Sequence, residues 1–227
     1  MLMNISRNEI KDLLEDAAGD IPQCQLDEMA VPSYLHSNPL IGWLLRKRHR
    51  AILKVAQLTG QETVLDFGCG IGLLLPMLCE RARDVQATDL APQIAQHLVR
   101  KKNLRVKFHP SDRLEQSIAE GSLDLIIAQE SMEHLEDPVS YIMLFRRKLK
   151  PSGRIIMSGP TENLVYRLGR LIAGFGGKQG YHHSNVDQLD SLLRGSGWEP
   201  TASQKLPFRV PPHIYKIASY RRHRVTA

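Results

Sequence analysis

Cysteines, aromatic residues and long apolar runs are all scarce in this sequence. The three cysteines, Cys24, Cys69 and Cys79, have no CxxC spacing, which argues against a disulfide framework or a zinc site. No stretch reaches the roughly 18 apolar residues that a membrane-spanning helix requires. The polar, acidic start is not typical of a secretory signal. We therefore expect a soluble protein of a reducing, cytoplasmic compartment.

The overall composition is that of an ordinary globular protein. The 227 residues are 42% hydrophobic and 24% charged, which suits one α/β domain with some decoration, or at most two small ones. The net charge of +6 favours anionic partners such as nucleic acid or an acidic lipid surface. A surplus of this size is also common on a solvated surface, so both interpretations stay open.

The pattern of residues changes near residue 60. Before it, apolar spacing predicts helices over residues 5–17 and 40–58, and three prolines predict an irregular connection over 21–39. We interpret residues 1–60 as a helical extension and residues 61–227 as the main domain.

Strands and helices alternate after residue 60. Two further strands are expected after Trp198, as an antiparallel pair. The alternation predicts an α/β fold with a doubly wound, Rossmann-like sheet, mostly parallel, with an antiparallel C-terminal strand. The expected strands are 63–67, 85–88, 105–109, 123–128 and 153–158, and the expected helices are 72–81, 92–101, 138–149 and 186–194, with a short one after Asp112.

Three glycines follow the first expected strand at alternate positions, Gly68, Gly70 and Gly72. Glycines at a strand-to-helix turn permit tight backbone geometry and close approach of a ligand. Asp89 ends the second strand at the distance where an acid can accept hydrogen bonds from a ribose diol. By itself Asp89 is also a plausible helix N-cap. Together with the glycine turn, it predicts a nucleotide-like ligand.

The segment DFGCGIG, from Asp66 to Gly72, resembles the first motif of class I S-adenosylmethionine-dependent methyltransferases. The resemblance extends over roughly residues 62–198 and includes the segments 123–138 and 149–160 in the expected order. It implies that the turn at Gly68 and Gly70 faces the amino-acid end of the cofactor, with Asp66 near its ammonium group. Cys69 is expected to be a small residue of the turn rather than a nucleophile. The resemblance assigns the remaining cofactor contacts to Gly72, Asp89, Leu90, Ser111, Asp112 (at the adenine amino group) and Gln129 (near the sulfonium).

Glu130, Glu133 and His134 form an ExxEH segment after the fourth strand. On a helical turn these positions share one face, so they could converge on one divalent cation such as Mg²⁺. The segment resembles the metal-binding motif of the O-methyltransferases of ubiquinone biosynthesis, and also that of small-RNA 2′-O-methyltransferases. Two alternatives stay open: a metal-free mechanism with Glu130 or His134 as general base, and a purely structural role.

His182 and His183 lie in a glycine-rich stretch after the fifth strand. In the resembled families this region often covers the acceptor, and glycine-rich loops can act as lids. One of these histidines could serve as base or complete a metal site. The alternative is an ordinary polar loop.

The leading hypothesis is methylation of an oxygen on a small organic acceptor, a quinone-like phenol or a natural product. The alternatives are an RNA methyltransferase, which the low aromatic content and the lack of a recognisable RNA-binding appendix argue against, and a non-catalytic cofactor-binding regulator. The helix over 40–58 carries the basic run from Arg46 to Arg50. We expect this helix to cap the acceptor side with its basic face solvated, or alternatively to touch an anionic membrane.

Overall fold

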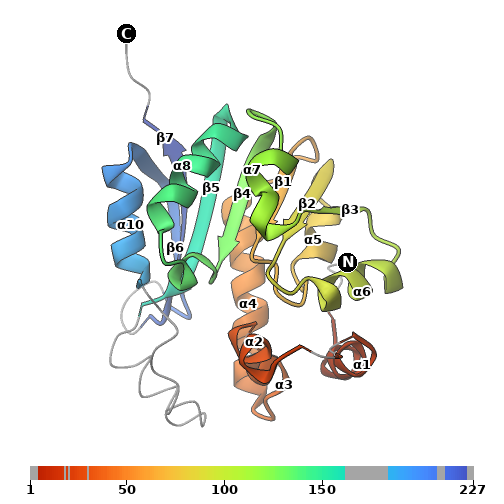
Figure 1. The fold of residues 1–227 in the computed structure, drawn as a ribbon. Helices are drawn as coiled ribbons and strands as arrows, with labels where there is room; N and C mark the ends of the chain where they lie inside the picture. Colours follow the sequence, from red (N-terminus) through yellow and green to blue (C-terminus); the bar gives the residue numbers. More distant parts are fainter. Residues whose placement is uncertain are drawn as a thin grey trace.

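A mixed sheet forms the centre of the computed structural model, which describes residues 5–17, 19, 21–29, 31–161, 184–208 and 213–223. The strands are β1 (Thr63–Phe67), β2 (Asp84–Thr88), β3 (Val106–Phe108), β4 (Leu123–Gln129), β5 (Leu149–Pro160), β6 (Trp198–Leu206) and β7 (Tyr215–Arg222). Their order is β3-β2-β1-β4-β5-β7-β6 (Figure 1). The first five pair in parallel, whereas β7 is antiparallel to both β5 and β6. The predicted doubly wound sheet with an antiparallel C-terminal end is confirmed.

Helices connect the strands and precede them. The helices before the sheet are α1 (Arg7–Ala17), α2 (Gln23–Glu28), α3 (Val31–Leu35) and α4 (Pro39–Ala56). Those within it are α5 (Leu75–Cys79), α6 (Gln93–Lys101), η1 (Ser111–Arg113), α7 (Leu114–Ser117), η2 (Met132–His134), α8 (Pro138–Lys148) and α10 (Val186–Gly195). Within the described ranges, no helix is long and apolar enough to cross a membrane.

The two faces of the sheet are covered by different helices, because successive side chains of a strand point to opposite faces. On one face, Leu65 and Phe67 of β1 pack with side chains of α7, α8 and α10. On the other, Val64 of the same strand packs with Ile52 and Val55 of α4 and with side chains of α5 and α6. Every residue of β1 is buried as a result.

Two expectations about the helices were wrong. The stretch 21–39 is not irregular, because it forms α2 and α3 between its prolines. The helix after the glycine turn begins at Leu75 rather than at residue 72, and Pro76 lies in its first turn, where the missing proline N–H costs no hydrogen bond.

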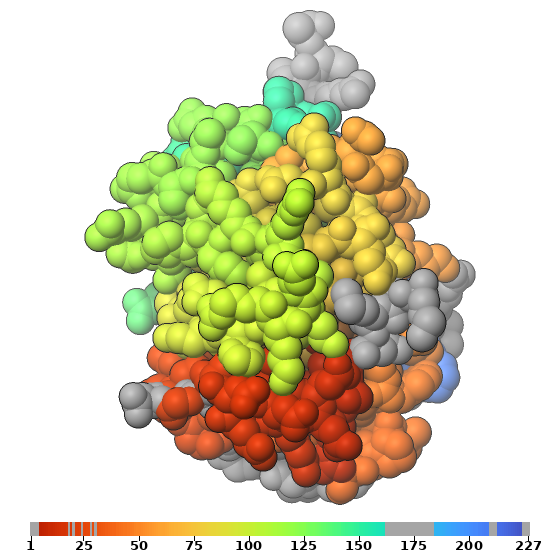
Figure 2. Space-filling model, turned by 90° about the vertical axis from the view of Figure 1, so that its right-hand side faces the viewer, coloured from red at the N-terminus to blue at the C-terminus, as the bar shows by residue number. Residues whose placement is uncertain are grey.

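The N-terminal helices pack on the main domain. Asn38 caps α4 by accepting a hydrogen bond from the N–H of Leu40 at 2.9 Å. Ile10 and Leu13 of α1 join the apolar cluster that includes Ile94 and Leu98 of α6. Figure 2 shows this red N-terminal segment lying directly against the yellow-green one. Because α4 also packs on the sheet, a domain division at residue 60 stays a prediction.

Candidate cofactor and acceptor site

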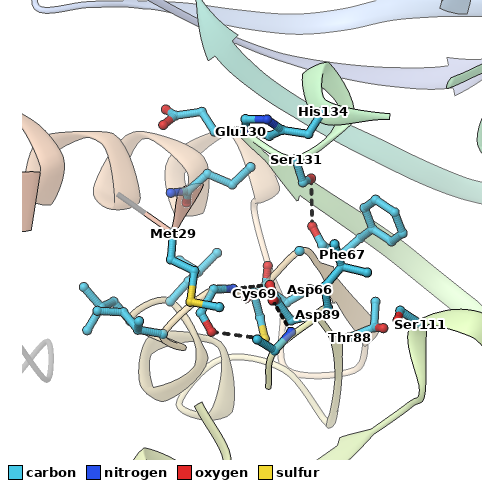
Figure 3. A pocket seen from close by; sticks show the side chains of 18 of the residues that line it. Met29, Asp66, Phe67, Cys69, Thr88, Asp89, Ser111, Glu130, Ser131 and His134 are labelled. Carbon is cyan, nitrogen blue, oxygen red and sulfur yellow. Dashed lines mark hydrogen bonds between the residues drawn. The ribbon is translucent and has the colours of Figure 1, made fainter. Parts of the chain in front are cut away.

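A cavity of about 200 Å³ opens at the carboxyl ends of β1, β2 and β4. The strand order reverses between β1 and β4, because the strands after β1 are added towards one edge of the sheet and those after β4 towards the other. Ligands of such sheets bind at this switch point. Figure 3 shows Glu130, Ser131 and His134 on one side of the cavity and Asp66 and Asp89 on the other. The N-terminal helices complete the wall with Gln25, Met29, Tyr34, Arg48 and His49.

The glycine turn forms the floor of the cavity. Gly68 has a φ of +72°, and a β-carbon there would collide with the side chain of Ser131. The N–H of Gly68 donates to the carbonyl of Thr88 at 2.9 Å, which ties the turn to the end of β2. Gly72 does not line the cavity. A β-carbon at Gly72 would lie only 3.0 Å from the β-carbon of Ala95 in α6, so this glycine allows α6 to pack closely.

Asp66 is a buried acid that enters the cavity from β1. It is 2% exposed, and its Oδ2 has no hydrogen-bond partner among the described residues. Burial and the nearby charge of Asp89 raise the pKa of Asp66 to about 7. Thr88 Oγ1, on the same wall, is likewise buried without a partner in the described part of the chain. Such orphaned groups favour a bound ligand that carries a cation and hydrogen-bond donors.

Asp89 connects the two turns that line the cavity. Its Oδ2 accepts from the N–H of Gly70 at 2.7 Å, and its Oδ1 accepts from the N–H of Ala91 at 3.0 Å. The bond to Ala91 closes a turn ahead of α6, whose N-cap is Pro92 without a side-chain hydrogen bond, so the N-cap role that the sequence left open for Asp89 was wrong. A carboxylate has about four lone-pair sites, so each oxygen can still accept from a ligand hydroxyl.

The rim beyond Asp89 is only partly as expected. Leu90 lines the cavity while 78% exposed, and Ser111 lines it as well. Asp112 does not belong to the wall: its side chain is 74% exposed and pairs with Arg113 at 3.6 Å.

Cys69 lines the cavity, and burial raises the pKa of its thiol well above the usual value. The thiol is therefore protonated near neutral pH, as expected of a residue that is not a nucleophile.

The other side of the cavity contains a buried ion pair that the sequence did not reveal. Glu130 follows β4 with a φ of +50°, and its Oε1 pairs with Nη1 of Arg48. Arg48 is 2% exposed. The expectation that the basic run from Arg46 to Arg50 is solvated was therefore wrong for Arg48. Gln129, with its carbonyl oxygen towards this guanidinium, accepts from Arg48 Nε at 3.2 Å and Nη2 at 2.8 Å.

His49 and Tyr34 lie beside this pair. His49 Nε2 is 3.4 Å from the hydroxyl of Tyr34, and burial together with the charge of Arg48 lowers the pKa of His49 to about 3. The signal for these residues was present in the sequence. Arg48 and His49 follow Leu45 and precede Ile52 at helical spacing, so they occupy the buried stripe of α4.

The expected convergence of Glu130, Glu133 and His134 was wrong. Glu130 precedes η2 and has a left-handed backbone, so the three residues do not share one helical turn. Glu133 is 3% exposed and its carboxylate lies near Gly159, outside the cavity that Glu130 and His134 line. In the part of the chain that the structure describes, no three His, Cys, Asp or Glu side chains are grouped to hold a metal ion. His182 and His183 lie outside the described residues.

Comparison with known proteins agrees with this geometry. A family model described as a methyltransferase domain matches residues 40–203. The mitochondrial ubiquinone biosynthesis O-methyltransferase of Schizosaccharomyces pombe is 31% identical over 152 residues, which cover 60% of this chain and 55% of that protein. The ubiquinone biosynthesis O-methyltransferase of Xanthomonas oryzae pv. oryzae is 36% identical over 100 residues, which cover 42% and 41%. The chain thus spans about half the length of these curated relatives, or less.

A solved structure shows the same fold. The N-methyltransferase NodS of Bradyrhizobium japonicum, in complex with S-adenosyl-L-homocysteine, superposes with a TM-score of 0.65 and 19% identity. The match covers 88% of this chain and 97% of NodS. With the family match over residues 40–203, these findings confirm the resemblance seen in the glycine turn. The chain belongs to the methyltransferase domain family, within the class I S-adenosylmethionine-dependent methyltransferases.

Proposed function

We propose that this chain transfers the methyl group of S-adenosylmethionine to a hydroxyl oxygen of a small organic acceptor, such as a phenol of the quinone-precursor type. The observation that carries the proposal is the asymmetry of the cavity. One side holds the orphaned carboxylate of Asp66, and the other holds the carboxylate of Glu130 beside His134. The names of the curated relatives support oxygen as the acceptor atom.

The residues of the cofactor side fit the groups of S-adenosylmethionine. Asp66 would receive the ammonium group, because an adjacent cation satisfies a buried carboxylate. Asp89 would accept from the ribose diol with lone pairs that Gly70 and Ala91 leave open. Leu90 would cover the adenine ring with its exposed side chain, and Ser111 would face the ring edge. When bound, the cofactor supplies a methyl group on a positively charged sulfur that leaves as a neutral thioether.

On the acceptor side, Glu130 has the position of a general base. Its Oε1 is engaged by Arg48, and it contributes to the wall of the cavity. We propose that Oε2 accepts the hydrogen bond of the acceptor hydroxyl and takes its proton as the new oxygen–carbon bond forms. His134 lines the same side and is the second candidate for this proton. His182 and His183 stay candidates for covering the acceptor.

A divalent cation held by Glu130, Glu133 and His134 is not part of this proposal. Glu133 lies outside the cavity wall, and the charge of Glu130 is already matched by that of Arg48. The proposal therefore depends on positioning and on a protein base rather than on a metal-activated hydroxyl.

The experiment that tests the function is an assay of S-adenosyl-L-homocysteine release. The panel contains catechols, monophenols, anilines and short RNAs, each assayed with and without a chelator. We expect turnover with one or more hydroxylated aromatics that survives chelation. Turnover confined to anilines or to RNA would overturn the choice of acceptor. Loss of turnover on chelation, restored by Mg²⁺, would overturn the metal-free mechanism. Cofactor binding without turnover across the panel would favour a regulator.

We further propose a peripheral contact with an anionic membrane. Leu40, Trp43 and Phe208 are 69%, 46% and 58% exposed. Lys47 links them, because its Nζ lies 4.5 Å from the centre of the Trp43 ring and donates to the carbonyl of Pro207 at 3.1 Å. Exposed apolar side chains beside lysine and arginine suit a surface of acidic headgroups. The cytoplasmic compartment itself stays a prediction.

A further inference from the structure

Arg48 is the most deeply buried charged side chain near the cavity that the proposed reaction does not use. It is 2% exposed and lies on the stripe of α4 that also contains Leu45 and Ile52. Removing a guanidinium from water is unfavourable unless its donors are satisfied by protein groups. The groups that accept hydrogen bonds from Arg48 therefore indicate the role of this side chain.

The donors of Arg48 are directed at three other side chains. Nη1 pairs with Glu130 Oε1, and Nη2 donates to the hydroxyl of Tyr34 at 3.1 Å. Nε and Nη2 also donate to the carbonyl oxygen of Gln129. The guanidinium lies 5.4 Å from the centre of the Tyr215 ring. These contacts use four of the five N–H groups of the guanidinium, so Arg48 is directed mainly at protein groups rather than at an acceptor.

Glu130 is held in an unusual backbone conformation. Its φ of +50° lies in the left-handed region, which is unfavourable for a residue with a side chain. The N–H of Glu130 donates to the carbonyl of Ser158 at 3.0 Å, and the ion pair with Arg48 fixes the other end of the residue. The ion pair engages Oε1. Within the described ranges, Oε2 has no hydrogen-bond partner.

We propose that Arg48 is a positioning residue that holds the carboxylate of Glu130 so that Oε2 faces the acceptor hydroxyl. Tyr34 steadies the guanidinium from α3, so the helices before the sheet take part in arranging the base. This inference rests on the proposed function, because it assigns to Arg48 the orientation of the proposed base. The N-terminal extension is then a component of the acceptor site as well as its cover.

The charges around the pair agree with this role. Burial alone would lower the pKa of the Arg48 guanidinium, but the charge of Glu130 raises it above the usual value. Burial and the charge of Arg48 keep His49 neutral, because a second cation beside the guanidinium is unfavourable. His49 is therefore a poor proton acceptor, and Glu130 remains the better-placed base.

A double-mutant cycle on the 227-residue chain tests the proposal. The variants are Arg48→Met, Glu130→Gln and their combination, assayed with the acceptor identified by the panel. We expect Glu130→Gln to lower kcat about 10²-fold or more, and Arg48→Met to lower kcat about tenfold or more with little change in the KM for S-adenosylmethionine. If Arg48 acts through Glu130, the double variant is no slower than Glu130→Gln alone.

The matched control is Arg50→Met, which removes an exposed arginine from the same helix and should leave kcat unchanged. Arg48→Lys keeps the charge but not the planar fork, so we expect partial recovery of kcat. If Arg48→Met fails to fold, the same cycle is run with Arg48→Lys and with Tyr34→Phe. Calorimetry with S-adenosyl-L-homocysteine verifies that each variant still binds this ligand with the affinity of the parent.

Failure of the positioning role and failure of the proposed base give different kinetic results. Rate losses that multiply in the double variant would show that Arg48 acts independently of Glu130, and would overturn the positioning role. An unchanged kcat for Glu130→Gln would overturn the base of the proposed function itself. A loss confined to the KM for the acceptor in Arg48→Met, with kcat unchanged, would also overturn positioning, because it would indicate direct binding of the acceptor.

Discussion

The carboxylates of Asp66, in β1, and Asp89, directly after β2, face the same cavity, and the charge of Asp89 disfavours ionisation of Asp66. Figure 3 shows the two side chains next to each other at the glycine turn. Asp66 is the more deeply buried of the two, and its pKa is raised to about 7 by burial and by Asp89. The pair makes cofactor binding and protein stability depend on pH in ways that can be measured.

Binding of S-adenosyl-L-homocysteine should weaken as pH falls below about 7. In the free protein Asp66 gains a proton there, and a bound ammonium group must displace that proton. We expect the Kd to rise by up to about tenfold per pH unit below pH 7. Calorimetry between pH 5.5 and 8 measures this dependence. In Asp66→Asn the affinity should be lower and nearly independent of pH. A steep dependence that persists in Asp66→Asn would contradict the assignment.

The same substitution should stabilise the folded protein at alkaline pH. The unfolded chain ionises Asp66 from about pH 4, whereas the folded protein keeps the proton until about pH 7. Stability is therefore lost as pH rises from about 4 to about 7. Asp66→Asn avoids this loss, so its melting temperature at pH 8 should exceed that of the parent, by the equivalent of a few kcal/mol at most. The difference should disappear near pH 4. A difference that does not vary with pH would show that ionisation is not its cause.

Asp89→Asn should weaken cofactor binding without unfolding the glycine turn. Asparagine keeps an oxygen that can accept from the N–H of Gly70, but it loses the negative charge. Hydrogen bonds to charged groups contribute about 1.5–3 kcal/mol each, so we expect the Kd for S-adenosyl-L-homocysteine to rise about tenfold or more. Asp112→Asn is the control, because Asp112 is exposed and lies off the wall. An effect of Asp112→Asn as large as that of Asp89→Asn would restore Asp112 to the site.

Gly68→Ala should destabilise the protein more than Gly60→Ala. Both glycines have positive φ, but a β-carbon at Gly60 would meet nothing within 4 Å, whereas one at Gly68 would collide with Ser131. The Gly60 variant therefore reports the backbone cost of alanine at positive φ alone, about 1–2 kcal/mol. Melting temperatures compare the two. Adding Ser131→Gly to Gly68→Ala should recover part of the loss. Equal losses in the two single variants would show that the close approach to Ser131 does not matter.

Anionic vesicles should shift the tryptophan fluorescence of the protein. The chain has two tryptophans, and Trp43 is 46% exposed whereas Trp198 is 1% exposed. A change on vesicle addition therefore reports on Trp43. We expect a blue shift with phosphatidylserine vesicles that is weakened by salt and is absent with phosphatidylcholine. Lys47→Gln should reduce the shift. No shift with phosphatidylserine at low salt would rule out the proposed membrane contact.

The sheet and the cofactor side could be predicted from the sequence because their signals are local. Alternating strands and helices, the glycines from Gly68 to Gly72 and the acid Asp89 lie in short segments whose backbone geometry depends on neighbouring residues. The bounds predicted for the strands were correct to within a few residues. The stretch 21–39 was mistaken for an irregular connection because helices of five or six residues leave little periodicity to detect.

The acceptor side was decided by tertiary structure. The sequence placed Glu130, Glu133 and His134 on one helical turn, but the chain leaves β4 through a left-handed residue that spacing cannot reveal. The sequence also left Arg48 in a solvated basic run. Burial of an arginine depends on a carboxylate to match it, and that carboxylate, Glu130, comes 82 residues later. Hydrophobic periodicity and the secondary-structure propensities of the residues determine which segments become strands and helices. Whether a charged side chain can be buried depends instead on partners that only the folded chain brings together.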